Sequence, residues 1–112
     1  MSRIYTDHNG LAVNAISMDN GVDVNGHQYQ VLLADKTVEL NFQQGTVPEH
    51  VVNGLTSEAL LEILAHRITV LQEAVPCREN AVARTHIETA LLWLERRTAK
   101  RLERGVEGTE AA

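Results

Sequence analysis

The residues best suited to chemistry in this chain are five cations that lie within nine positions of one another: Arg96, Arg97, Lys100, Arg101 and Arg104. They are half of the ten Lys and Arg residues in the sequence. The segment Gly105-Val106-Glu107-Gly108-Thr109 follows them directly. Guanidinium groups and outward-pointing backbone N–H groups both favour oxyanions, so this pattern predicts an anion site, with phosphate the usual candidate.

The same basic turn has a simpler interpretation as a helix cap. Cations near a helix C-terminus complement its partial negative charge, and Glu95 and Glu103 are spaced to form ion pairs along the helix. Five cations against one Glu within residues 96–104 exceed what a cap requires. Anion binding is therefore the favoured interpretation, and the cap remains the alternative.

No catalytic or metal-binding pattern stands out in the sequence. Cys77 and His86 fall on one expected helix, about 13 Å apart along its axis, so they cannot share a hydrogen bond within one chain. The five histidines lack metal-ligand spacing, and no Walker loop or dinucleotide fingerprint is present. We therefore expect a protein that is not an enzyme and that uses no metal or cofactor.

Three other side chains are weaker candidates for ligand contact. Trp93 could stack on a base, but its neighbours Ala90 and Leu94 favour a packing role. Arg67 and Arg78 flank the expected connection between two helices, and for each alone a solvated surface position is the simpler interpretation. Both arginines are kept as candidate ligand-binding residues.

Composition restricts the class of protein. At 112 residues the chain is expected to form one domain, and its aromatic residues are few, which favours burial against further copies of the chain. Residues 1–95 carry five Lys or Arg against twelve Asp or Glu, which disfavours DNA as a partner. A single cysteine and the lack of a long apolar run predict a soluble, cytoplasmic protein without a membrane segment.

Short strands and turns are expected over residues 1–54. Alternation around residues 11–16 is weakly strand-like, and residues 37–42 place Val38, Leu40 and Phe42 on one face. Asn25-Gly26 is the predicted hairpin turn, because both residues of such a turn need positive φ. Residues 34–36 are expected to form the next turn.

Two long helices are expected over residues 55–105. Thr56 is the predicted N-cap of the first, which should end near Ala74 because Pro76 disfavours helix at the residue before it. The second is expected from Pro76 or Cys77 to Arg104, with Gly105 following as the residue that ends it. The predicted seam of the first helix is Leu61, Leu64, Ile68, Leu71 and Val75. The predicted stripe of the second is Ile87, Leu91, Leu94, Thr98 and Leu102, widened by Ala83, Ala90 and Trp93.

These elements predict an α+β fold with a small N-terminal antiparallel β-sheet followed by a long antiparallel helical hairpin. The expected organisation is a single domain, 1–112, with a β-rich part at 1–54, the hairpin at 55–105 and a C-terminal tail at 106–112. A second helix longer than its partner must protrude or pack on another subunit.

From about residue 52 onward the sequence also resembles the hairpin-domain family shared by phage anti-CBASS and Thoeris anti-defence proteins. The pieces that carry the resemblance are Val52-Asn53-Gly54-Leu55-Thr56-Ser57-Glu58-Ala59-Leu60-Leu61, His66-Arg67, Cys77-Arg78-Glu79-Asn80-Ala81, Leu91-Leu92-Trp93-Leu94, Arg96-Arg97-Thr98 and Arg104-Gly105-Val106-Glu107-Gly108-Thr109. Phe42-Gln43-Gln44-Gly45 resembles the strand end before the helices in members that have an N-terminal sheet. The sheet-before-hairpin order resembles the Thoeris-directed branch.

The resemblance implies a sponge that binds immune signals in the infected host cell and does not cleave them. The implied ligand is a cyclic di- or trinucleotide or a cyclic ADP-ribose isomer, held between subunits of a homo-oligomer, commonly a hexamer. Arg97, Arg101 and Arg104 would then supply guanidinium forks, and residues 105–109 would supply N–H and hydroxyl donors. The alternative is a helical-hairpin module for oligomerisation or protein interaction, whose basic turn binds an acidic partner.

Overall fold

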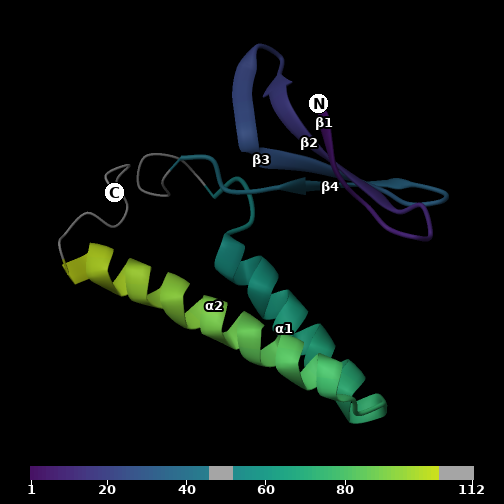
Figure 1. The fold of residues 1–112 in the computed structure, drawn as a ribbon. Helices are drawn as coiled ribbons and strands as arrows, with labels where there is room; N and C mark the ends of the chain where they lie inside the picture. The colour runs from purple at the N-terminus through teal and green to yellow at the C-terminus, as the bar shows by residue number, and fades with distance from the viewer. Residues whose placement is uncertain (46–51, 104–112) are drawn as a thin grey trace. The chain divides into compact units, whose positions relative to one another are not determined.

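The computed structural model describes residues 1–45 and 52–103, and in this part the chain is a four-stranded sheet followed by two helices (Figure 1). In order, the elements are β1 (Ser2–Thr6), β2 (Ala12–Asp19), β3 (Val22–Leu32), β4 (Thr37–Asn41), α1 (Ser57–Ala74) and α2 (Arg78–Glu103). The chain divides into two compact units, Met1–Leu55 and the part that begins at Thr56. The predicted α+β fold with an N-terminal sheet and a helical hairpin is confirmed.

The sheet is an antiparallel meander in the order β1-β2-β3-β4, so each strand pairs with the next one along the chain. The turn between β2 and β3 is Asn20-Gly21, with φ of 51° and 80°, and Asp19 pairs with Val22 across it. Positive φ at both central residues is what a two-residue hairpin needs to match the twist of its strands. Leu33 N donates to Lys36 O at 2.8 Å in the expected turn before β4.

The prediction that Asn25-Gly26 forms the hairpin turn is wrong. Both residues lie inside β3, where residues 24–27 bulge opposite Ser17, because Ile16 pairs with Gln28 and Met18 pairs with Asp23. Gly26 supplies the positive φ, 82°, that the bulge requires. Asn20-Gly21 and Asn25-Gly26 satisfy the same local rule, and the pairing of β2 with β3 selects the earlier pair as the turn.

The two faces of the sheet differ in polarity, since cross-strand partners share a face. One face carries a polar row that crosses all four strands: Arg3, Asn14, Gln30 and Glu39. Arg3 Nε donates to Asn14 Oδ1 at 2.7 Å, and Asn14 is 8% exposed. The other face is mainly apolar and consists of Tyr5, Val13, Ala15, Tyr29, Val31, Val38 and Leu40.

The end of β4 is tied to the segment just before the helices. Phe42 forms a parallel bridge with Leu55, and its ring meets Tyr29 edge to face at 5.7 Å. Gln43 N donates to Leu55 O at 2.7 Å, and Leu55 N donates to Asn41 O at 2.8 Å. These contacts hold Leu55, the residue before the N-cap of α1, against residues 41–43 at the end of β4.

The ends of the helices follow the capping signals in the sequence. Thr56 Oγ1 accepts a hydrogen bond from Ala59 N at 3.1 Å, which confirms the predicted N-cap, and α1 ends at Ala74 as expected. Helix α2 begins at Arg78, and Cys77 Sγ accepts from Asn80 N at 3.4 Å just before it. The two helices pack on each other as an antiparallel pair (Figure 1). The expected end of the second helix, Arg104 and Gly105, lies outside the described residues.

The contact between the helices is narrower than the sequence pattern predicts. On α2 the expected stripe is covered from Ile87 through Leu91, which is 7% exposed, to Thr98. The next covered position is Arg101 at 7%, whereas the expected Leu102 is 62% exposed. Arg101 follows Thr98 by three residues and Leu102 follows it by four, and only the position three residues on lies on the covered side of the helix.

On α1 the covered line runs through Leu61, Ala65, Ile68 and Gln72. Leu64, Leu71 and Val75 were expected in the seam but are 38%, 41% and 72% exposed. A single partner helix covers only one line of side chains, and the apolar positions beside that line stay open.

Candidate anion-binding site at the end of helix α2

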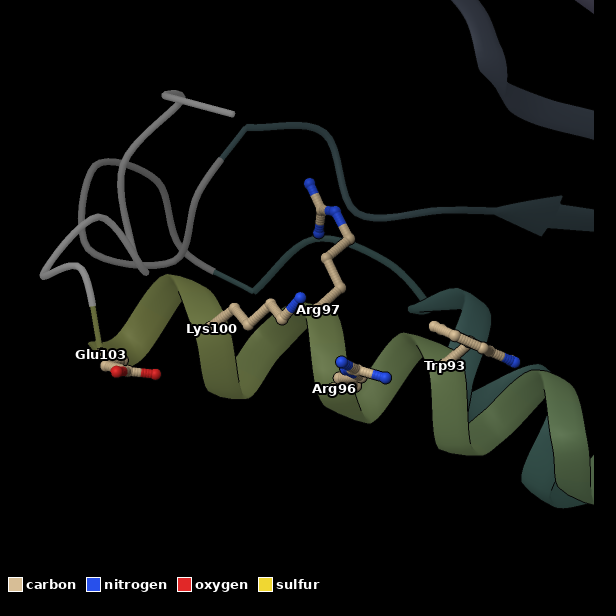
Figure 2. A pocket seen from close by; sticks show the side chains of 5 residues that line it. All are labelled: Trp93, Arg96, Arg97, Lys100 and Glu103. Atoms are coloured by element: carbon tan, nitrogen blue, oxygen red, sulfur yellow. The ribbon is translucent and has the colours of Figure 1, made fainter.

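The described basic residues of the candidate site lie on the last turns of α2: Arg96, Arg97, Lys100 and Arg101. Figure 2 shows the first three of them. Lys100 and Arg101 belong to its last turn, where they complement the partial negative charge of the helix C-terminus. Residues 104–109, which complete the site expected from the sequence, lie outside the described residues. The described part of the site therefore consists of side chains from one helix.

Arg101 is the buried member of the cluster. It continues the covered stripe of α2 one turn beyond Thr98, about 35 Å along the helix from Arg78. Helix α1 is about 27 Å long, so this position lies beyond the level of the first residue of α1. A guanidinium keeps its charge under all physiological conditions, and at 7% exposure this one is held in a defined place.

Arg97 lies one turn before Arg101 and is exposed. It sits about 29 Å along α2 from Arg78, while Ser57 sits about 26 Å along α1 from Ala74. Both residues therefore lie far from the connection between the helices, Arg97 near the C-terminal end of α2 and Ser57 at the N-terminal end of α1. That end carries unpaired N–H groups and partial positive charge, although Glu58 in the first turn offsets part of it. The cations of α2 and the positive terminus of α1 therefore both lie at helix ends that are remote from the connection between the helices.

Arg67 and Arg78 do not join this group within one chain. Both are exposed, and they lie about 10 Å before the end of α1 and at the first residue of α2, respectively. Counted along the two helices from their connection, they are separated from Arg97 by about 18 Å and 29 Å. The structure therefore brings together Arg97 and Arg101, and leaves the other two described candidates apart from them.

A hollow on the same end of α2 is lined, among the described residues, by Trp93, Arg96, Arg97, Lys100 and Glu103 (Figure 2). Trp93 is 62% exposed, and the Arg96 guanidinium carbon lies 5.2 Å from its ring centroid. The expected packing role of Trp93 is therefore not found within one chain. Spacings of three, four and seven residues from Trp93 to the three cations were the available signal that they share a face.

The described residues show no arrangement typical of metal or nucleophile chemistry. Within residues 1–45 and 52–103, no three His, Cys, Asp or Glu side chains are grouped as metal ligands. The Cys77 sulfur accepts a hydrogen bond at the start of α2, and His86 is exposed on the same helix. No helix in the described part of the chain is long and apolar enough to span a membrane.

Comparison with known proteins gives two matches. Residues 34–99, which include β4, α1 and most of α2, match the family described as "Acb2/Tad1, hairpin domain". "Thoeris anti-defense 1" from Bacillus phage SBSphiJ7 is 48% identical over 77 residues, which are 68% of this chain and 54% of that protein. The matched part thus spans about half the length of this relative. The family match includes Arg67, Arg78, Trp93 and Arg97 but ends before Arg101.

Proposed function

Because the chain belongs to the Acb2/Tad1 hairpin-domain family, we propose that it is a phage anti-defence protein that sequesters a cyclic signalling molecule without cleaving it. The proposed ligand is a cyclic di- or trinucleotide or a cyclic ADP-ribose isomer. The observation that supports the proposal is that Arg97 and Arg101 lie one turn apart on the last turns of α2, where Arg97 is exposed and Arg101 is 7% exposed.

The chemistry of the ligand matches this end of the hairpin. Each of these molecules carries phosphate groups that are negatively charged at neutral pH and that guanidinium forks bind in a bidentate manner. Burial of Arg101 restricts its side chain before the ligand arrives, so less conformational entropy is lost on binding. Exposed Arg97, one turn away, remains accessible to a ligand from solvent. One preorganised and one accessible guanidinium suit tight capture of a small polyanion.

We propose that the site is completed by further copies of the chain, in a homo-oligomer and most simply a hexamer. The hairpin leaves large apolar side chains uncovered: Ile63, Leu64, Val70, Leu71, Val75, Val82, Leu92 and Leu102. Such an exposed apolar surface on a small protein favours association. In an oligomer, Arg67 and Arg78 of one subunit can approach Arg97 of another, which a single chain does not allow.

Release of an intact ligand is the expected outcome of this mechanism. The proposed contacts are guanidinium groups and a helix terminus, which bind phosphate and offer neither a nucleophile nor a general base near it. The protein would therefore act stoichiometrically, and its effect would depend on its concentration relative to that of the signal.

The test is a thermal-shift and calorimetric screen of the purified protein. The panel contains cyclic dinucleotides, cyclic trinucleotides and cyclic ADP-ribose isomers, with their linear counterparts as controls. A ligand at 100 times its dissociation constant is expected to add about 2.7 kcal/mol to the stability. Heat denaturation of the complex should release the same molecule, as measured by mass spectrometry. Binding of none of the cyclic molecules would contradict the proposal and favour the protein-interaction module.

A further inference from the structure

We propose that Trp93 and Arg96 form a stacking shelf for a planar ring of the ligand, next to the cations that bind its phosphate. This inference rests on the proposed function and adds a residue type that phosphate binding does not need. It assigns recognition of the base to the outer face of α2, in the hollow lined by Trp93, Arg96, Arg97, Lys100 and Glu103 (Figure 2).

The first observation is the exposure of the indole ring. Trp93 is the only tryptophan in the chain, and 62% of it is accessible to solvent. A large aromatic side chain contributes most to stability when it is buried, so this position gains little from Trp within one chain. Nucleobases, in contrast, stack on exposed aromatic rings whatever their sequence, because every base has a π-face.

The second observation is the position of Arg96. Its guanidinium carbon lies 5.2 Å from the centroid of the Trp93 ring, within the distance of a cation–π contact. This contact restricts both side chains and places a planar cation beside a planar ring. A base can then stack on the exposed ring area or on the guanidinium plane, since both surfaces accept bases.

The third observation is the order of charges along the helix. Arg97 and Lys100 follow Trp93 by one and two turns, about 6 Å and 10 Å along the axis, on the same side. Glu103 lines the far end of the hollow, and its carboxylate disfavours phosphate there. The charges therefore orient a nucleotide with its base at Trp93 and its phosphate between Arg97 and Lys100.

A second copy of the chain without a bound anion is a less suitable occupant of this hollow than a ligand. In a two-fold symmetric contact the same face meets itself, so Arg96, Arg97 and Lys100 of one copy would approach the same cations of the other. Like charges brought together out of water raise the free energy of the contact. An anionic ligand neutralises these cations instead.

The experiment uses the fluorescence of Trp93, which reports on this position alone because no other tryptophan is present. Wild-type protein is titrated with each cyclic molecule that binds, and its emission is recorded together with affinity by calorimetry. Trp93→Leu removes the ring, Trp93→Phe keeps a smaller ring, and Glu95→Ala is the matched control on an exposed position of the same helix. Light scattering checks the assembly state of each variant.

Stacking predicts a change in emission on binding and a loss of affinity of roughly 5- to 150-fold for Trp93→Leu, the range that corresponds to one stacked base. Trp93→Phe should lose much less, and Glu95→Ala should bind as the wild type does. If ligands bind with unchanged emission and Trp93→Leu keeps full affinity, the inference is wrong and the proposed function stands. If Trp93→Leu breaks the assembly, Trp93 is a subunit contact and the inference is also wrong. If no cyclic molecule binds the wild type, both fail together.

Discussion

The side chain of Asn53 forms two hydrogen bonds with the backbone of Gln44. Two paired strand residues exchange the same pair of bonds through their backbones. Gln44 N donates to Asn53 Oδ1, and Asn53 Nδ2 donates to Gln44 O, both at 2.9 Å. Asn53 N also donates to Gln43 Oε1 at 2.9 Å. This reciprocal arrangement joins the chain just after β4 to the residues just before α1.

Replacement of Asn53 by alanine tests this junction. Asn53→Ala removes the two side-chain hydrogen bonds to Gln44 and is expected to lower the free energy of unfolding by about 1–3 kcal/mol. Urea denaturation measures the change. Asn9→Ala, in the exposed turn between β1 and β2, is the control and should cost less. Equal effects of the two substitutions would contradict a special role for Asn53.

Gly54 is expected to be intolerant of any side chain. A Cβ at this position would lie 2.5 Å from the Phe42 carbonyl carbon and 2.6 Å from Asn41 O, which are backbone atoms that cannot rotate away. Gly54→Ala should therefore destabilise by about 1–3 kcal/mol or more. Gly10→Ala is the control, because Gly10 has a φ of 86° and open space around it. The added Cβ meets no neighbour there, so the substitution should lower the stability only through the unfavourable positive φ, by about 1–2 kcal/mol. If Gly54→Ala costs no more than Gly10→Ala, the close approach is not what requires glycine at position 54.

Leu91 and Leu92 separate the stability of one hairpin from that of the assembly. Leu91 is 7% exposed, so Leu91→Ala should cost about 2–5 kcal/mol through loss of burial and the cavity that remains. Leu92 is 65% exposed, and Leu92→Ala should cost little in a single chain. Thermal unfolding and light scattering at several protein concentrations measure both effects. A large, concentration-dependent effect of Leu92→Ala would place it in a subunit contact.

Some of the arginines are expected to contribute to ligand binding alone, and others to both ligand binding and the stability of the fold. Arg97→Ala removes an exposed side chain, so it should weaken ligand binding by about 1.5–3 kcal/mol while unfolding stays close to wild type. Arg101→Ala should weaken binding and also change the melting temperature, because Arg101 is buried. Arg104→Ala, beyond the described residues, is expected to act as Arg97→Ala does. Full affinity in all three variants would move the phosphate site to Arg67 and Arg78.

The assembly state is a separate prediction. Uncovered apolar side chains on both helices lead us to expect an oligomer at micromolar concentration, with a hexamer as the specific expectation. Light scattering of the purified protein gives the mass directly. A 12.4 kDa particle would show that the hairpin is stable as a monomer and that the exposed apolar residues have another use.

The sequence alone determines the features that depend on neighbouring residues. Thr56 caps α1 because its hydroxyl reaches the N–H three residues on, and Pro76 limits α1 to Ala74 because it disfavours helix before it. The strand at residues 37–41 and the stripe from Ile87 to Thr98 follow from the repeat of apolar residues along a few turns or steps. In each case the interactions that determine the structure are between residues that are close in the sequence.

Tertiary structure determines the features for which the local sequence allows two alternative conformations or two alternative buried positions. Asn20-Gly21 and Asn25-Gly26 are equivalent as dipeptides, and only the pairing of β2 with β3 makes the first a turn and the second part of a bulge. Arg101 is covered and Leu102 is open because burial depends on the direction of a side chain from the helix axis, whatever its hydrophobicity. Trp93 is exposed for the same reason. Periodicity tells which residues share a face, but only the packed neighbours determine which face is covered.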